Sequence, residues 1–320
     1  MNQDIYVVIE HLQGRVSDIS HVMLAGARAL AQQTGGEVVG VLLGHNAQNL
    51  NRNLAADRVL YMDHPALAEF TPDAYLNALA DLVAEMKPRA VLFGNTSIGA
   101  DLASVLSARL NLPLVSSCRT IGADGELISQ ICGGKILAET PLPDSLTLIS
   151  MIPGGYKPEE GQSETPPAVI TVPPPALDNL RVTLSRYIEP ETADVDITRA
   201  EFLVAIGRGI QNPDNIELAE ELAEAMGGVV CASRPIVDQG WLPTSRLVGK
   251  SGKSVKPKVY LALGISGAPE HLEGMTGSET IIAINTDLAA PIFDVAHYGA
   301  EVDMLELMEL LVERVHAQPA

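Results

Sequence analysis

The chain has 320 residues, of which 47% are hydrophobic, and it carries 40 acidic against 21 basic side chains. This length and apolar fraction suffice for the cores of two ordinary domains of about 100 to 200 residues each. The formal net charge of −19 argues against nucleic-acid binding, which needs clustered Lys and Arg to neutralise phosphates.

The cysteines and the first residues narrow the setting further. Cys118, Cys132 and Cys231 form no CxxC pair and have no histidine at ligand spacing, so neither a disulfide framework nor a zinc site is expected. The opening residues, MNQDIYVVIEH, begin a strand-like run rather than a cleavable leader, and no apolar run reaches the roughly 18 residues of a membrane helix. We therefore expect a cytoplasmic protein that is not an integral membrane protein.

The first 118 residues alternate short apolar runs with helical patterns. The runs are rich in Val and Ile and lack strict alternation, as strands covered by helices on both faces do. The expected strands cover residues 5–10, 37–43, 58–63, 89–95 and 112–118, and the expected helices cover residues 20–34, 72–86 and 99–110. This order predicts an α/β domain with a doubly wound parallel sheet.

The pattern changes between residues 125 and 172. Four short strand candidates, at 126–134, 135–141, 145–155 and 168–175, follow one another with Gly and Pro between them and without long helices. We interpret them as a mostly antiparallel extension of the first sheet. The prolines at 173–175 then mark a connection, because they fit neither a helix interior nor a central strand.

After the connection the strand and helix alternation resumes, which predicts two domains, residues 1–195 and 196–320. Expected strands lie within 201–209, 229–235, 258–264 and 280–286, with helices at 215–228 and 304–317. In an open parallel sheet, ligands bind in the crevice outside the carboxyl ends of the strands. The loops that follow these strands are therefore the places to look for chemistry.

Two of these loops carry arginine. Gly207, Arg208 and Gly209 follow the first strand of the second domain, and Ser233 and Arg234 follow the second. The glycines alone are equally consistent with a simple turn, and a lone Arg is more often an exposed salt-bridging residue. As ligand groups, the cations could reach a pyrophosphate or lie against an aromatic cofactor.

The next two loops combine glycine with hydroxyls. Gly249, Lys250, Ser251, Gly252 and Lys253 resemble a phosphate loop but lack its G-x-x-x-x-G-K-[ST] spacing, so a solvated basic loop is an equal alternative. Gly264, Ser266 and Gly267 could cradle phosphate with backbone N–H groups.

His271 follows these glycines, and a lone histidine is more often structural than functional. A Ser/His hydrolase is disfavoured, because no nucleophile elbow or acid partner accompanies Ser266 and His271. Asn285, Asp287 and Asp303 follow the last strands and read individually as cap or turn residues. Together, however, these loops at one sheet edge predict a ligand site.

In their order, these segments resemble the FAD-binding domain of electron transfer flavoprotein alpha subunits. The segments that carry the resemblance are GRG from 207, SRPIVDQGWLP from 233, VGKSGKSVKPKVY from 248, GISGAPEHLEGM from 264, IAINTDLAAPIF from 282 and YGAEVD from 298. Weaker similarity covers the first domain, in GADLASVLSARLNLPLVSSC from 99, GGKILAE from 133 and PGGYKP from 153. The resemblance implies a Rossmann-like FAD-binding domain after the first α/β domain.

The resemblance also implies which positions contact FAD. They are Arg208, Ser233, Arg234, Val248, Gly249, Lys250, Ser251, Ser266, Gly267, Ala268, Pro269, Glu270, His271, Asn285 and Asp303. Arg234 would lie over the isoalloxazine, Ser251 would hydrogen-bond N5, and His271 would approach N1 and O2. These three would tune electron affinity rather than make or break substrate bonds.

The family relationship implies a subunit rather than a stand-alone enzyme. Its FAD would carry electrons within a heterodimer with an electron transfer flavoprotein beta subunit, which would hold AMP or a second FAD. Expected partners are acyl-CoA or other flavoprotein dehydrogenases and, for a bifurcating member, NADH, ferredoxin or a quinone oxidoreductase. Many members have Gln-Thr and Ile-Gln where this chain has Lys250–Ser251 and Pro269–Glu270, and this variant resembles the electron-bifurcating branch.

Two other functions remain open from the residues alone. An NAD(P)-dependent oxidoreductase is weakened because Asn212 replaces the third glycine of the dinucleotide motif and no acidic residue follows about 20 positions later. A nucleotide-binding regulatory module rests only on the general α/β pattern of the first domain.

Overall fold

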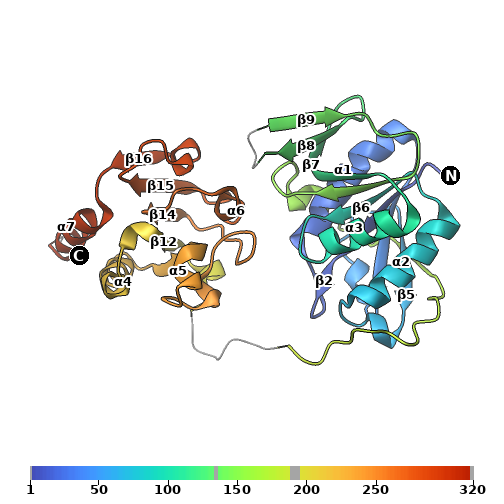
Figure 1. Cartoon of the computed structure of the whole chain (residues 1–320), viewed down its shortest axis with the longest axis horizontal. Coiled ribbons are helices and arrows are strands. Elements are labelled where there is room, and N and C mark those ends of the chain that lie inside the picture. Colours follow the sequence, from blue (N-terminus) through green and yellow to red (C-terminus); the bar gives the residue numbers. More distant parts are fainter. Residues whose placement is uncertain (1, 133–135, 188–194, 318–320) are drawn as a thin grey trace. The chain divides into compact units, whose positions relative to one another are not determined.

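The computed structural model describes residues 2–132, 136–187 and 195–317. The chain divides into two compact units, residues 1–187 and 188–320, and each is described by itself (Figure 1). Residues 133–135, which the sequence places at the junction of two expected strands, lie outside the described residues, as do residues 188–194 of the expected connection.

The first unit contains three long helices, α1 (Asp18–Thr34), α2 (Pro72–Met86) and α3 (Gly99–Leu110), among its described residues. Its strands are β1 (Ile5–Val8), β2 (His11–Leu12), β3 (Arg15–Val16), β4 (Val38–Gly44), β5 (Arg58–Asp63), β6 (Ala90–Gly94), β7 (Leu114–Ile121), β8 (Leu127–Ile131), β9 (Ile136–Thr140), β10 (Thr147–Met151) and β11 (Ala168–Thr171).

The large sheet of this unit has the order β11-β5-β4-β1-β6-β10-β7-β8-β9 in the described residues. All of its pairings are parallel except those of β8 with β7 and β9, so the predicted doubly wound sheet with an antiparallel extension is confirmed. The extension is smaller than expected. The expectation that residues 145–155 and 168–175 belong to it is wrong, because β10 inserts between β6 and β7 and β11 pairs with β5, both in parallel.

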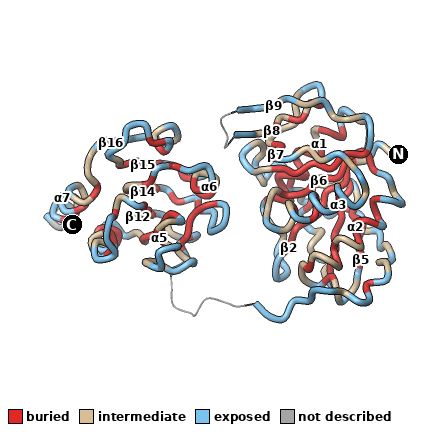
Figure 2. Tube along the Cα trace, viewed as in Figure 1, coloured by how far each residue is buried: buried red, intermediate tan, exposed pale blue. Residues whose placement is uncertain are grey.

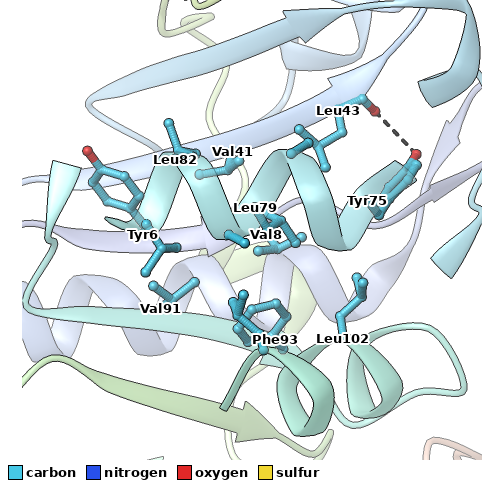
Figure 3. Packing of buried hydrophobic residues seen from close by; sticks show 14 of the residues in the cluster. Tyr6, Val8, Val41, Leu43, Tyr75, Leu79, Leu82, Val91, Phe93 and Leu102 are labelled. Carbon is cyan, nitrogen blue, oxygen red and sulfur yellow. Dashed lines mark hydrogen bonds between the residues drawn. The ribbon is translucent and has the colours of Figure 1, made fainter. Parts of the chain in front are cut away.

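Helices cover both faces of this sheet. On β1, Tyr6 and Val8 pack with residues of α2 and α3, whereas Ile5 and Val7 pack with residues of α1. Figure 3 shows the first of these clusters, in which the Tyr75 hydroxyl donates to the Leu43 carbonyl at 3.4 Å. The central strands β1, β4, β6 and β10 are buried along their whole length (Figure 2), which explains why their sequences lack polar alternation.

The connecting segment follows the surface of the first unit up to Tyr187. The Arg181 guanidinium donates to both carboxylate oxygens of Asp73, at 2.7 and 3.1 Å, and the Tyr187 hydroxyl donates to Glu69 at 2.5 Å. Leu177 is buried against the core of this unit. The part of the connection before residue 188 is therefore attached to the first unit.

The second unit is a smaller parallel α/β domain. Its strands are β12 (Phe202–Ile206), β13 (Val229–Ala232), β14 (Val259–Leu263), β15 (Thr280–Asn285) and β16 (Tyr298–Glu301), and its helices are α4 (Ile216–Ala225), α5 (Arg234–Asp238), α6 (Pro269–Leu272) and α7 (Met304–His316). The strand order is β13-β12-β14-β15-β16, with every pairing parallel. In the part of the chain that the structure describes, we find no helix with the length and apolar character of a membrane span.

Candidate functional site

The strand order of the second unit reverses at β12, because β13 lies on one side of it and β14 on the other. At this switch point the backbones come into close contact. A Cβ on Gly209 would stand 2.7 Å from the Gly264 Cα, and a Cβ on Gly207 would stand 2.2 Å from the Gly264 carbonyl oxygen. The glycines that were ambiguous in sequence thus have a packing role, at the position where parallel sheets bind ligands.

The loop after β13 brings Arg234 beside the glycine-rich loop at 248–253. Val248 N–H donates to the Ala232 carbonyl at 3.0 Å, which extends the edge of the sheet into this loop. Arg234, at the start of α5, donates to the Ser251 hydroxyl at 3.4 Å and forms an ion pair with Asp238 at 3.3 Å. Arg234 and Ser251, which the sequence assigns to one cofactor ring, therefore meet in the structure.

The glycine-rich loop is fastened to α6 by backbone contacts. Lys250 N–H donates to the Glu270 carbonyl at 2.7 Å, and Gly249 adopts a φ of +134°, a conformation reserved for glycine. A Cβ on Gly249 would stand 2.7 Å from the Glu270 carbonyl oxygen. This requirement explains a glycine at 249 and places Lys250 and Ser251 against the strand-end loops.

The loop after β14 supplies the other side of the site. Gly267 and Pro269 do not line the cavity, and Ile292 N–H donates to the Ser266 carbonyl at 3.1 Å. Ser266, Ala268 and Glu270 do line it. The short helix α6 thus presents only some of its predicted residues to the cavity.

His271 lies at the cavity wall and is 6% exposed. Its Nδ1 is 3.1 Å from the Val248 carbonyl oxygen, and its Nε2 is 3.0 Å from the Tyr260 hydroxyl. Burial lowers the pKa of His271 to about 4, against a smaller opposite effect of the Val248 carbonyl. The imidazole is consequently neutral near pH 7, and both of its nitrogens have hydrogen-bond partners within the protein.

The last two predicted residues have structural bonds as well as positions on the cavity. Asn285 donates from Nδ2 to the Ile265 carbonyl at 2.9 Å and accepts from Asp287 N–H at 3.1 Å. Asp303 accepts from Leu305 N–H at 2.8 Å and caps α7. The cap and turn roles expected from sequence are therefore present, and both side chains also line the cavity.

These loops enclose one cavity of about 710 Å³, within the range of pockets that bind cofactors. Thirteen of the predicted positions line it, the exceptions being Gly267 and Pro269. Its apolar lining includes Leu247, Ile265, Ile284, Val302 and Met304. An elongated molecule with an apolar ring system and an anionic, hydrogen-bonding portion fits this combination of groups.

Several lining residues were missed by sequence reasoning. Gln211, Asp238 and Thr286 line the cavity without having been named as candidates. Asp238 stands four residues after Arg234, so the helical spacing could have indicated their pairing. Gln211 has no comparable signal, because its position depends on the turn that follows the switch-point glycines.

Among the described residues, no group of three or more His, Cys, Asp or Glu side chains has the arrangement of a metal site. The buried Cys118 and Cys231 and the exposed Cys132 are free thiols.

Comparison with known families places both units. Residues 5–177 match the model described as "Electron transfer flavoprotein domain", and residues 196–276 match "Electron transfer flavoprotein FAD-binding domain". The second match covers the strand-end loops after β12, β13 and β14, together with α6.

Curated relatives agree over nearly the whole chain. The "Electron transfer flavoprotein subunit alpha" of Thermoanaerobacterium thermosaccharolyticum is 35% identical, over 98% of both chains. The "Acryloyl-CoA reductase electron transfer subunit beta" of Anaerotignum propionicum is 35% identical over 98% of this chain and 95% of that protein. The "Protein FixB" of Clostridium saccharobutylicum is 35% identical over 96% of this chain and 95% of that protein. The chain therefore belongs to the electron transfer flavoprotein alpha subunit family, which includes the FixB proteins.

Proposed function

We propose that the cavity of the second unit binds FAD and that the chain carries electrons through it as the alpha subunit of a heterodimer. The observation that carries this proposal is the convergence of five strand-end loops on one cavity in the unit that matches the FAD-binding model. When bound, FAD would supply an isoalloxazine that accepts and releases electrons. The residues of the chain would bind and orient it and set its electron affinity.

The donor set fits the chemistry of FAD. Arg208, Arg234 and Lys250 offer cations to the pyrophosphate or to the ring, and the hydroxyls of Ser233, Ser251 and Ser266 offer hydrogen bonds. Gly209 and Gly264, whose backbones are in close contact at the switch point, also line the cavity.

The assignment of roles within the site is part of the proposal. Arg234 and Ser251, which are hydrogen-bonded to each other, would contact the isoalloxazine, with Arg234 favouring its reduced, negatively charged state. The other lining residues expected from the sequence, among them Val248, Gly249, Ala268, Asn285 and Asp303, would shape the pocket around the ribityl and phosphate portions.

The proposal is tested by purifying the chain with its partner subunit. A yellow protein whose flavin absorbance survives dialysis and bleaches on reduction supports FAD binding. Tight NAD binding without flavin would instead support a dehydrogenase, and stabilisation by ATP without flavin would support a regulatory nucleotide module.

We further propose that the partner is an electron transfer flavoprotein beta subunit, because the relatives that cover the full chain include electron transfer flavoprotein subunits. Coexpression should yield a one-to-one complex. A chain that stays monomeric with bound FAD when its beta-like neighbour is present would contradict the heterodimer without affecting the cofactor assignment.

Electron bifurcation is the finer form of this proposal. It is supported by the sequence variant at Lys250–Ser251 and Pro269–Glu270, which resembles that of the electron-bifurcating branch. In the structure, Lys250 Nζ lies 3.9 Å from a carboxylate oxygen of Glu273 on the neighbouring segment. Counting nucleotides per heterodimer decides it. Two FAD molecules are required, and one FAD with one AMP would eliminate bifurcation.

A further inference from the structure

Four carboxylate side chains line the cavity, and the chain uses them differently. Asp287 and Asp303 each accept from a backbone N–H two residues later, so both serve the backbone that follows them. Among the described residues, Asp238 is the one lining carboxylate that forms an ion pair, and its partner Arg234 is a lining cation. The negative charge of Asp238 therefore faces the cavity together with the positive charge of Arg234.

Two bonds hold the guanidinium of Arg234, and they come from different elements. Its Nε donates to an Asp238 carboxylate oxygen at 3.3 Å within α5, and its Nη1 donates to the Ser251 hydroxyl at 3.4 Å on the glycine-rich loop. A guanidinium has several N–H donors in one plane, so two bonds orient this plane and leave other donors for a ligand. Asp238 thus affects both the orientation and the net charge that Arg234 presents.

The order of charges in α5 does not serve the helix itself. Arg234 is its first residue and Asp238 its last, whereas the helix dipole favours an acid at the start and a cation at the end. Pairs four residues apart also stabilise a helix better when the acid comes first. The two side chains are 67% and 62% exposed, where an ion pair adds little to stability. The cavity that both side chains line explains the pair better than the stability of α5 does.

We propose that Asp238 is the counter-ion of Arg234 at the flavin site and lowers the electron affinity of the flavin by offsetting part of the guanidinium charge. This inference rests on the proposed function and deepens it. Reduction adds negative charge to the isoalloxazine, which a nearby cation favours and a nearby carboxylate disfavours. Arg234 and Asp238 then act on the flavin potential in opposite directions, and the residue at 238 sets how much of the Arg234 charge the cofactor experiences.

The test is a redox titration of the purified heterodimer at pH 7 and low salt. Asp238→Asn removes the charge and keeps an oxygen that can accept from Arg234 Nε. The electron affinity of its flavin should rise about threefold, a typical strength for an exposed charge interaction, which raises the one-electron potential by about 30 mV. Asp238→Glu keeps the charge at the same helical spacing and should restore the wild-type potential.

Two controls separate this effect from a change in net charge. Glu201→Gln removes an exposed carboxylate that pairs with Lys258 at 2.9 Å. These two residues directly precede β12 and β14, at the amino edge of the sheet and opposite the cavity, so the flavin potential should stay unchanged. In addition, the shift caused by Asp238→Asn should shrink at 1 M salt, where the screening length falls to about 3 Å.

An unchanged or lower potential in flavin-loaded Asp238→Asn would overturn the inference, and so would an equal rise in Glu201→Gln. If the Asn variant does not assemble with flavin, the equally neutral Asp238→Ser decides the question in the same titration. A wild-type heterodimer that takes up no FAD would defeat the proposed function and this inference with it. A flavin that binds but does not respond to the charge at residue 238 would defeat the inference alone.

Discussion

Replacing Gly249 by alanine should separate the glycine-rich loop from α6 and remove the cofactor. The φ of +134° is strained for any residue with a Cβ, at a cost of about 1–3 kcal/mol. The new Cβ would also stand 2.7 Å from the Glu270 carbonyl oxygen, which is backbone and cannot rotate away. To reach ordinary contact the loop must shift, and the Lys250–Glu270 hydrogen bond of 2.7 Å is then lost, for about 1 kcal/mol more. We expect a total loss of about 3 kcal/mol.

The assay is denaturant unfolding of the flavin-free protein, followed by fluorescence of Trp241, the single tryptophan of the chain, which packs against the core of the second unit. A fluorescence titration with FAD measures cofactor binding. Gly227→Ala is the matched control, because Gly227 has a φ of +68° but open space around its Cβ position. It should cost roughly 1 kcal/mol and leave FAD affinity unchanged.

Equal destabilisation by Gly249→Ala and Gly227→Ala would refute the reasoning, since it would mean that the contact with α6 has no energetic weight. Normal FAD affinity in a folded Gly249→Ala protein would show that this loop does not form part of the cofactor site.

The remaining predictions concern charge. His271, with its folded pKa lowered to about 4, should destabilise the second unit by about 3 kcal/mol as pH falls from 6.5 to 4, and His271→Gln should flatten this part of the unfolding profile, because the unfolded state binds the extra proton. Arg234→Ala should lower the flavin potential by tens of millivolts in a redox titration, since a tenfold change in electron affinity is about 59 mV; an unchanged or higher potential would contradict its placement at the ring. Arg181→Ala should release the connecting segment from Asp73 and speed limited proteolysis between residues 173 and 187, with no change in cleavage as the contrary result. Glu10→Gln should not lower the stability of the first unit at pH 7, because burial raises the pKa of Glu10 and the neutral amide avoids that desolvation; clear destabilisation would show that the carboxylate is needed.

Local signals predicted most of the fold. The sequence bounds of α2 and α3 match the structure, because Pro72 and Gly99 stand at the first helical positions and Lys87 and Asn111 end the helices in left-handed conformations. Strands were found wherever apolar runs were short and rich in Val and Ile. Such signals depend on neighbours in the chain and are visible without the tertiary structure.

The pairing of strands that are distant in the sequence could not be predicted from local patterns. β10 is buried along its whole length and pairs in parallel with β6, which lies more than fifty residues earlier in the sequence. The short Gly- and Pro-separated segments around β10 suggested an antiparallel pairing instead. β11 likewise crosses to the far edge beside β5. Nothing in the local pattern of these segments distinguishes a parallel insertion from an antiparallel hairpin.

In the candidate site, too, local features could be predicted from the sequence and contacts between distant residues could not. The strand-end position of each loop could be predicted, and thirteen of the expected residues line one cavity. The state of His271 could not, because its partner Tyr260 is eleven residues away on a strand whose facing residues depend on register. Gly267 and Pro269 follow the family motif but do not line the cavity, and a Cβ on Gly267 would stand 2.3 Å from the Ile292 nitrogen.

The most direct test of the cofactor assignment is the flavin content of the heterodimer, purified without added nucleotide and dialysed. The account predicts FAD bound to this chain, and it predicts that Gly249→Ala reduces the FAD content while Gly227→Ala does not. A wild-type complex that folds and assembles without flavin, and that fails to take up FAD on titration, would contradict it.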